Sequence, residues 1–89
     1  GPGCTAADIM AVEAQMTTAM AGYLFTHPDV NGFLTNTNGM PNAQRRSMLA
    51  DYLAANPQTG AEIDAIKGPG VALRDRCNIP ASHLHLGLL

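Results

Sequence analysis

The fold of this chain is decided at YLFTHPDVN, residues 23–31. Before this stretch, apolar residues recur every three or four positions, which predicts a helix from about residue 5 to Phe25. Pro28 ends that helix, because the residue before a proline avoids the helical region. A proline also suits the first position of a following helix. His27 then stands in the capping position between two helices, and the stretch predicts a sharp helix–helix corner.

The same pattern returns at YLAANP, residues 52–57. Both stretches follow the order Tyr-Leu-x-x-cap-Pro, so a second corner is expected at Asn56 and Pro57. Asn is an ordinary helix cap, whereas His is a poor one. His27 is therefore the residue that sets the first corner apart from the second.

Helices account for the whole predicted domain. Three more are expected, over about residues 28–34, 41–55 and 57–77, with a break or kink where Gly-Pro-Gly occupies residues 68–70. No stretch shows strand periodicity bounded by hairpin turns. The sequence predicts an all-α fold, a small bundle of about four helices joined at proline-marked corners.

Length and charge restrict the kinds of partner. The chain has 89 residues, of which 46% are hydrophobic and 13% charged, with a formal net charge of −2. That length holds one domain, and the composition is the opposite of a disordered chain. Five Lys and Arg residues, spread along the chain, do not form the basic stripe of a nucleic-acid binder, so no nucleic acid is expected as a partner. No apolar run approaches the roughly 20 residues of a membrane span.

The sequence offers little support for catalysis. It contains no Gly-rich phosphate loop, no CxxC motif and no local signature of a Ser or Cys nucleophile. Its seven Asp and Glu residues are dispersed and suggest no carboxylate pair for acid–base chemistry. We therefore expect a binding protein and not an enzyme.

Two cysteines, Cys4 and Cys77, bracket the predicted helices. A core of small side chains in a short chain needs an additional crosslink. A disulfide between the two would close a long loop, is worth roughly 4 kcal/mol in the chain-entropy model, and implies an oxidising compartment. Two buried reduced thiols, or one reactive thiol, are the alternatives.

The two ends of the chain differ from its middle. Residues 1–3, Gly-Pro-Gly, are typical of a cloning scar, so we expect that a signal peptide was removed ahead of a domain over residues 4–80. Residues 81–89 form a C-terminal tail in which His83 and His85 make an HxH motif. In an extended chain both imidazoles point the same way and can take a transition metal, although no third ligand is nearby. A solvated tail is the alternative.

Tyr23 and His27 form the strongest candidate site. They stand four residues apart, so they share a helix face if the helix reaches residue 27. That face continues the apolar one that carries Met16 and Met20. A phenol and an imidazole at the edge of an apolar surface can hold a haem, because haem iron accepts His or Tyr as an axial ligand. The alternative is a core tyrosine beside an unusual helix cap.

Several of these features occur in a familiar order. Cys4 is followed by YLxxHPxVN at residues 23–31, by YLxANPQ at residues 52–58 and by Cys77. This order resembles the small secreted haemophore-like, haem-binding proteins of mycobacteria and related actinobacteria, over about residues 4–80. The resemblance implies an exported all-helical protein with one disulfide, between Cys4 and Cys77.

The same resemblance implies the ligand. It implies that non-covalent, b-type haem is captured outside the cytoplasmic membrane for iron acquisition, with a cell-envelope acceptor protein as the partner. The family's haem ligands are His and Tyr side chains, which His27, as the iron ligand, and Tyr23 match here. Position 56 carries Asn, and the tail histidines lie beyond the matched region, so the sixth iron ligand stays unassigned. A pocket in 89 residues would be shallow, which leaves room for a homodimer that shares one haem.

Two other functions fit the residues without the resemblance. In the first, the protein is a non-catalytic secreted helical module that binds a protein partner or another apolar ligand, and His27 is only a cap. In the second, it is a transition-metal binder that acts through His83 and His85. A titration with hemin, set against added zinc or copper, separates these hypotheses from haem binding.

Overall fold

The computed structural model describes residues 3–80, which form four α-helices and no strand. The helices are α1 (Ala6–Thr26), α2 (Pro28–Asn36), α3 (Asn42–Ala55) and α4 (Pro57–Cys77). The predicted all-α class is thus confirmed. Within the same residues, none of the helices combines the length and the apolar composition needed to cross a membrane. The tail over residues 81–89, with His83 and His85, lies outside the described residues.

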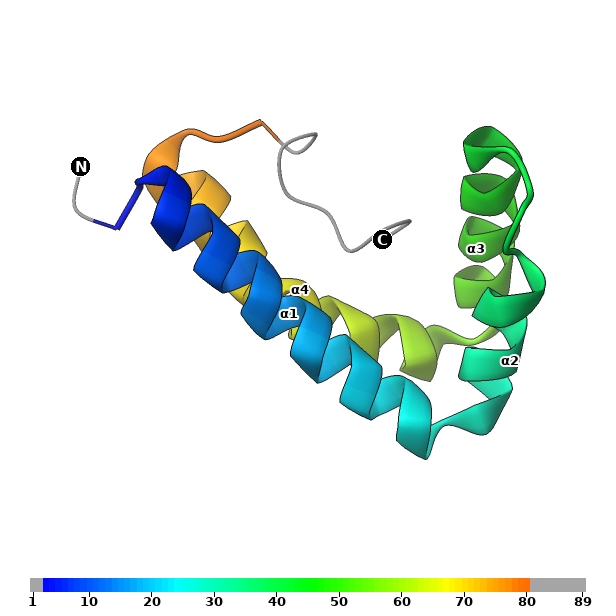
Figure 1. Ribbon diagram of the computed structural model, residues 1–89. Coiled ribbons are helices and arrows are strands. Elements are labelled where there is room, and N and C mark those ends of the chain that lie inside the picture. Colours follow the sequence, from blue (N-terminus) through cyan, green and yellow to red (C-terminus); the bar gives the residue numbers. More distant parts are fainter. Residues whose placement is uncertain (1–2, 81–89) are drawn as a thin grey trace.

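The helices are arranged in two arms that meet at an angle (Figure 1). The two long helices, α1 and α4, lie side by side and antiparallel in the first arm. The short helices α2 and α3 form the second arm, where the ring of Phe33 stacks on that of Tyr52 with 4.1 Å between centroids. Besides the contact between the two long helices, α2 packs against α1 and α3 packs against α4. The molecule is elongated, with extents of 39 × 26 × 22 Å.

The two predicted corners have the same backbone conformation. His27 lies at φ −129° and ψ 75°, and Asn56 lies at φ −130° and ψ 69°. At each corner the backbone N–H donates to the carbonyl of the leucine three residues earlier, at 3.2 Å. Proline occupies the start of the next helix in both cases. The repeated sequence pattern is therefore a repeated structure, and it joins α1 to α2 and α3 to α4.

Local signals also fix the outer ends of the long arm. The Thr5 side chain accepts from the Asp8 backbone N–H, and the Asp8 carboxylate accepts from Thr5 in return, which completes a capping box. At the other end α4 stops at Asn78, whose φ of 54° is left-handed, a conformation that Asn tolerates better than most residues. The disulfide between Cys4 and Cys77 joins these two ends, with 5.6 Å between the Cα atoms.

Of the break or kink expected at residues 68–70, the break does not occur, because α4 is one continuous helix across Pro69. Proline removes one intrahelical hydrogen bond and normally breaks a helix interior. Here side chains on both sides of Pro69 are fully buried, Ile63 and Leu73, both with 0% exposure, and Leu73 packs against Met16 of α1. Tertiary burial therefore overrides the local signal for a break.

The core of the long arm is small and depends on close approach of α1 and α4. Met16 packs against Leu73, with Ile9 and Val12 half-buried around them. Gly70 is buried opposite Met16, and a Cβ at position 70 would come within 2.6 Å of Met16 Sδ. The glycine is thus required by the approach of the two helices rather than by its backbone angles.

We expect Gly70→Ala to destabilise the protein by about 1 kcal/mol, because the cost of displacing a buried side chain exceeds the gain in helix propensity. Gly22→Ala is the matched control, since it lies inside α1 and nothing stands within 4 Å of its would-be Cβ. That control should gain up to about 1 kcal/mol. Urea unfolding measures both. Equal gains in the two variants would show that Met16 moves aside without cost.

Candidate functional site

His27 ends α1 and precedes α2, and its imidazole belongs to the first of these helices. Its side chain makes no hydrogen bond to the start of α2. Instead, Nδ1 lies 2.7 Å from the carbonyl oxygen of Tyr23 in the last turn of α1, and the Thr26 hydroxyl also donates to that oxygen, at 3.0 Å. The side chain therefore satisfies a carbonyl that the helix end leaves free. His27 therefore occupies the N-cap position of α2, as the sequence predicted, but its side chain caps the end of α1.

Two oxygens lie close to Nδ1, the Tyr23 carbonyl at 2.7 Å and the Thr26 hydroxyl at 3.0 Å. The carbonyl only accepts hydrogen bonds, so this shorter contact favours the tautomer in which Nδ1 carries the proton. In the neutral ring, Nε2 is then left with its lone pair. A hydrogen bond from one ring nitrogen to a backbone carbonyl is the arrangement that prepares the other nitrogen for a metal.

Tyr23 holds the imidazole a second time, through its ring. The two rings are stacked, with 3.9 Å between centroids and 14° between planes. The sequence predicted a shared helix face if the helix reached residue 27; α1 ends at Thr26, yet the two side chains are in direct contact. Both residues are half-buried, so the pair lies at the surface of the corner and not in the core.

The hydroxyl of Tyr23 reaches across to α4, where it donates to Glu62 Oε1 at 2.8 Å. Burial, followed by this hydrogen bond, raises the pKa of the Tyr23 phenol above its ordinary 10.0. The same bond, followed by one from Gln58, lowers the pKa of Glu62 below its ordinary 4.5. At neutral pH the pair is therefore a neutral phenol and a carboxylate. The stabilising effect of the lowered carboxylate pKa is lost as the pH falls below 4.5, and that of the raised phenol pKa is lost as the pH rises above 10.0.

The second corner shows what the fold alone requires. Asn56 Nδ2 donates to the carbonyl of Tyr52 at 2.8 Å, which is the bond that His27 makes to Tyr23. An amide side chain thus closes this kind of corner as well as an imidazole does. The corner geometry gives no reason for histidine at position 27, whereas ligand binding by a free Nε2 would.

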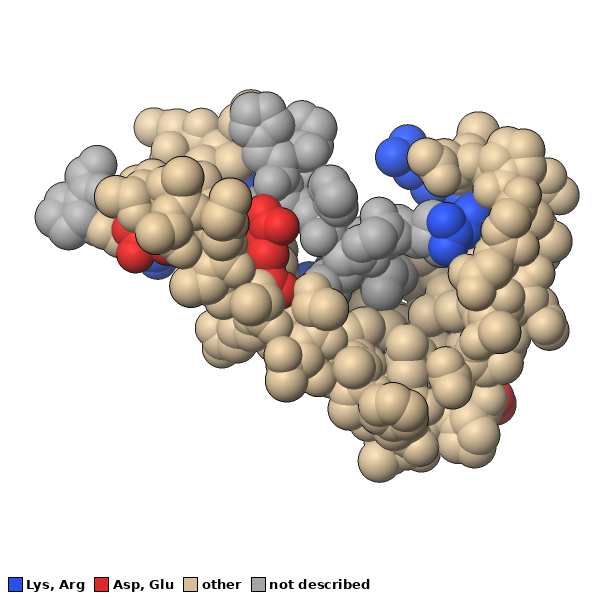
Figure 2. Space-filling view, in the orientation of Figure 1, with Lys and Arg blue, Asp and Glu red and all other residues tan. Residues whose placement is uncertain are grey.

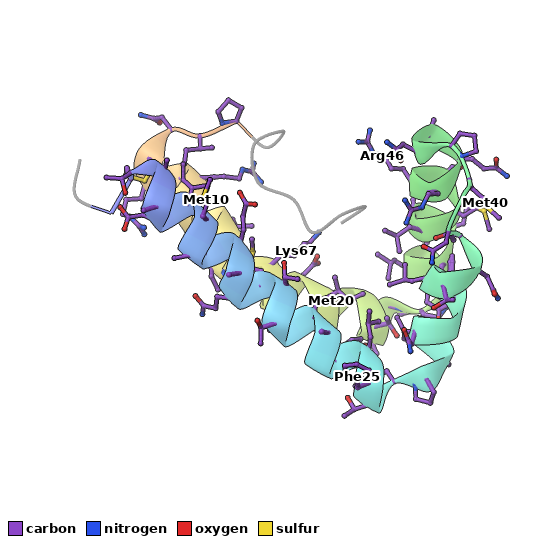
Figure 3. All side chains as sticks on the ribbon, in the orientation of Figure 1. Met10, Met20, Phe25, Met40, Arg46 and Lys67 are labelled. Carbon is purple, nitrogen blue, oxygen red and sulfur yellow. A yellow bond between two sulfur atoms is a disulfide. The ribbon has the colours of Figure 1, made fainter. Side chains whose placement is uncertain are left out.

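Apart from Glu62, which binds the Tyr23 hydroxyl, and Asp29 at the start of α2, the last turns of α1 carry no charged side chain. No Asp, Glu, Lys or Arg occurs between Glu13 and Asp29. On the face shown in Figure 2 the end of α1 carries no charged atoms, and Figure 3 places Phe25, with 83% of its surface exposed, in the last turn of that helix. An apolar ligand would therefore find the exposed ring of Phe25 and no charged side chain on the end of α1.

The methionines do not line this surface. The sequence suggested an apolar face continued from Met16 and Met20, but both are buried against α4, at 3% and 5% exposure. Close packing of α1 on α4 leaves no room for a ligand beside them. Their role is that of core residues.

The described residues do not form a site in which several side chains could bind one metal ion. Within the described part of the chain, no group of three or more His, Cys, Asp or Glu side chains could hold a metal ion. The HxH hypothesis concerns residues that lie outside this part. One imidazole with a free nitrogen matches a ligand that brings most of its own coordination, as haem does.

Sequence reasoning missed Glu62, which it treated as one of several dispersed acids. Tyr23 and Glu62 are 39 positions apart. Only the register of α1 on α4 brings them together, and that register follows from packing. The nearest available signal was the helical spacing of Glu62 from Gln58, which predicts a bond within α4 but not one to Tyr23.

Comparison with known proteins now adds to this geometry. A relative among curated proteins is the heme-binding protein Rv0203 of Mycobacterium tuberculosis, which is 26% identical over 88 residues. Those residues make up 97% of this chain but 65% of that protein, so the chain spans only part of its relative's length. No solved structure matches the chain.

The family comparison covers the four helices and both corners. The model of the family described as "Haemophore, haem-binding" matches residues 2–78. That description names a type of binding protein and not a class of enzyme. The chain therefore belongs to the haemophore, haem-binding family.

Proposed function

We propose that this protein binds haem at the first corner, with His27 Nε2 as the ligand to the iron. The observation that carries the proposal is the hydrogen bond from His27 Nδ1 to the Tyr23 carbonyl, because it leaves Nε2 with a free lone pair. Family membership and the similarity to a heme-binding protein support the same ligand. The uncharged end of α1 supplies the apolar contact that a porphyrin needs.

The binding is non-covalent in this proposal, and the haem is therefore b-type. Covalent attachment of haem uses cysteine thiols. Both cysteines of this chain are joined in the disulfide, and neither is free. Haem is cargo here, and the protein's contribution is to bind it and to hold the imidazole in place.

In this proposal the ring of Tyr23 supports the His27 imidazole, and the Tyr23 hydroxyl lies next to the bound haem. The sequence suggested that it binds iron as a phenolate. In the free protein the phenol keeps its proton and donates a hydrogen bond to Glu62. A bond from the phenolate to iron would therefore require loss of the proton and of this hydrogen bond. We therefore place the iron on His27 and assign Tyr23 to the support of the imidazole.

We further propose that the protein works outside the cytoplasmic membrane, secreted or in the cell envelope, and carries haem for iron acquisition without catalysing a reaction. The disulfide supports an oxidising compartment. A cell-envelope protein would receive the haem. The shallow, half-buried position of His27 suits release to such an acceptor, and it also suits a homodimer that encloses one haem between two corners.

An absorption titration of the protein with hemin tests the proposal. We expect a saturable shift of the Soret band with one haem per site, and no competition from zinc or copper. Absence of a shift would reject haem binding and would leave the helical module without a metal cofactor. A response to zinc or copper alone would favour the HxH tail.

Acid should weaken haem binding. A ligating imidazole must be unprotonated, because a proton and the iron compete for the same nitrogen. We therefore expect hemin affinity to fall as the pH is lowered. Titrations between pH 8 and pH 4.5, with helical content checked by circular dichroism at each pH, measure this. Constant affinity down to pH 4.5 would point to attachment by apolar contact alone.

A further inference from the structure

Glu62 has no part in the functions so far assigned, yet both oxygens of its half-buried carboxylate accept hydrogen bonds. Its carboxylate lies at one end of the long arm, where α4 passes the last turns of α1. One oxygen, Oε1, accepts from the Tyr23 hydroxyl at 2.8 Å, and the other, Oε2, accepts from Gln58 Nε2 at 3.3 Å. Both oxygens are therefore engaged, and Glu62 presents a fixed acceptor to α1.

Tyr23 is the single residue that links Glu62 to the His27 imidazole. Tyr23 touches His27 at two points, by ring stacking at 3.9 Å and by its carbonyl at 2.7 Å from Nδ1. The Tyr23 carbonyl belongs to the α1 backbone, so the contact with Nδ1 fixes the position of that nitrogen along the helix axis. The ring contact sets the tilt of the imidazole, but only if the phenol is itself fixed. The hydroxyl bond to Glu62 is what fixes it.

We propose that Glu62 is a positioning residue of the haem site, which holds the Tyr23 phenol and, through its ring, the plane of the His27 imidazole. This inference rests on the proposed function, because it gives the positioned imidazole an iron to bind. It adds a residue from α4 to a site otherwise built from the end of α1. Site residues must be held to within about 0.5 Å for full effect, which is why such outer partners matter.

The second corner argues that this arrangement is not a requirement of folding. Tyr52 occupies the place of Tyr23 there, and its ring is supported by Phe33 from α2. Among the described residues, no side chain accepts a hydrogen bond from the Tyr52 hydroxyl. A corner of this kind therefore forms without an acid to hold its tyrosine. Of the two corners, the one with an acid bound to its tyrosine is the one whose capping residue is a histidine.

The test compares hemin affinity in Glu62→Ala and Glu62→Gln, because Gln keeps the accepting oxygen and removes the charge. Loss of an outer partner of a metal ligand typically lowers affinity 10- to 100-fold. We expect about a 10-fold loss in Glu62→Ala and affinity near that of the wild type in Glu62→Gln. Asp64→Ala is the matched control, since it removes an exposed carboxylate from the same helix and should change nothing.

A second readout needs no haem. Stacking on Tyr23 shifts the NMR signals of the His27 ring protons upfield. In the apoprotein this shift should persist in Glu62→Gln and diminish in Glu62→Ala, with circular dichroism unchanged in both. Adding Glu62→Ala to Tyr23→Phe should cost no further affinity, because both variants break the same bond.

The outcomes separate the two proposals. If the wild type fails to bind hemin, the proposed function fails and this inference fails with it. If the wild type binds but Glu62→Ala binds equally well, only the role of Glu62 is overturned. Equal losses in the Ala and Gln variants would overturn it too, because they would assign the effect to charge. So would a far greater loss in Tyr23→Phe, which would place the iron on the phenol.

Discussion

Replacement of His27 by Asn is expected to abolish the Soret shift of added hemin while leaving the protein folded. The matching residue Asn56 donates to the Tyr52 carbonyl, so an amide at position 27 should donate to the Tyr23 carbonyl in the same way. Asn is also the better cap, so stability should stay within about 0.5 kcal/mol of the wild type. Hemin affinity should fall more than about 100-fold, since even outer partners of a metal ligand account for 10- to 100-fold.

The repeated corner supplies the control for this experiment. Asn56→Ala removes the equivalent hydrogen bond at the corner that has no histidine, and it should lower stability by about 1 kcal/mol with unchanged hemin binding. His27→Asn should thus lose hemin binding and keep its stability, whereas Asn56→Ala should lose stability and keep hemin binding. Retained binding in His27→Asn would defeat the ligand assignment and direct attention to Tyr23 and to the tail histidines.

Removal of the disulfide should be the largest single change in stability. The crosslink joins residues 73 positions apart, which in the chain-entropy model is worth about 4 kcal/mol. A domain of this size is stable by only about 5–10 kcal/mol, and few of its apolar side chains are fully buried. We expect Cys4→Ala/Cys77→Ala to melt on the order of 20 °C below the wild type.

Thermal unfolding with and without reductant makes the same comparison in the wild-type protein. Thiol titration of the unreduced protein should detect no free thiol, as both cysteines are paired. Below the lower melting temperature the double variant should still bind hemin, because the disulfide joins the start of α1 to the end of α4, whereas His27 follows the other end of α1. An unchanged melting temperature would mean that the core alone suffices.

The sequence by itself determined the features that depend on neighbouring residues. The capping box at Thr5 and the two proline corners each need only a few adjacent side chains, and both corners formed as expected. The repeated Tyr-Leu-x-x-cap-Pro order also identified His27 as the residue that sets the first corner apart from the second. Physical rules for helix ends act over one turn, which is why a sequence is enough to place them.

Only the tertiary structure decided the features that depend on how α1 lies on α4. The local rule predicted a break at Pro69, but burial of Ile63 and Leu73 keeps α4 continuous. The same packing buries Met16 and Met20, which the sequence placed on a binding surface, and brings Glu62 to Tyr23. Such contacts depend on the axial register of two helices, which small differences in side-chain shape select. No periodic pattern within either helix records that register.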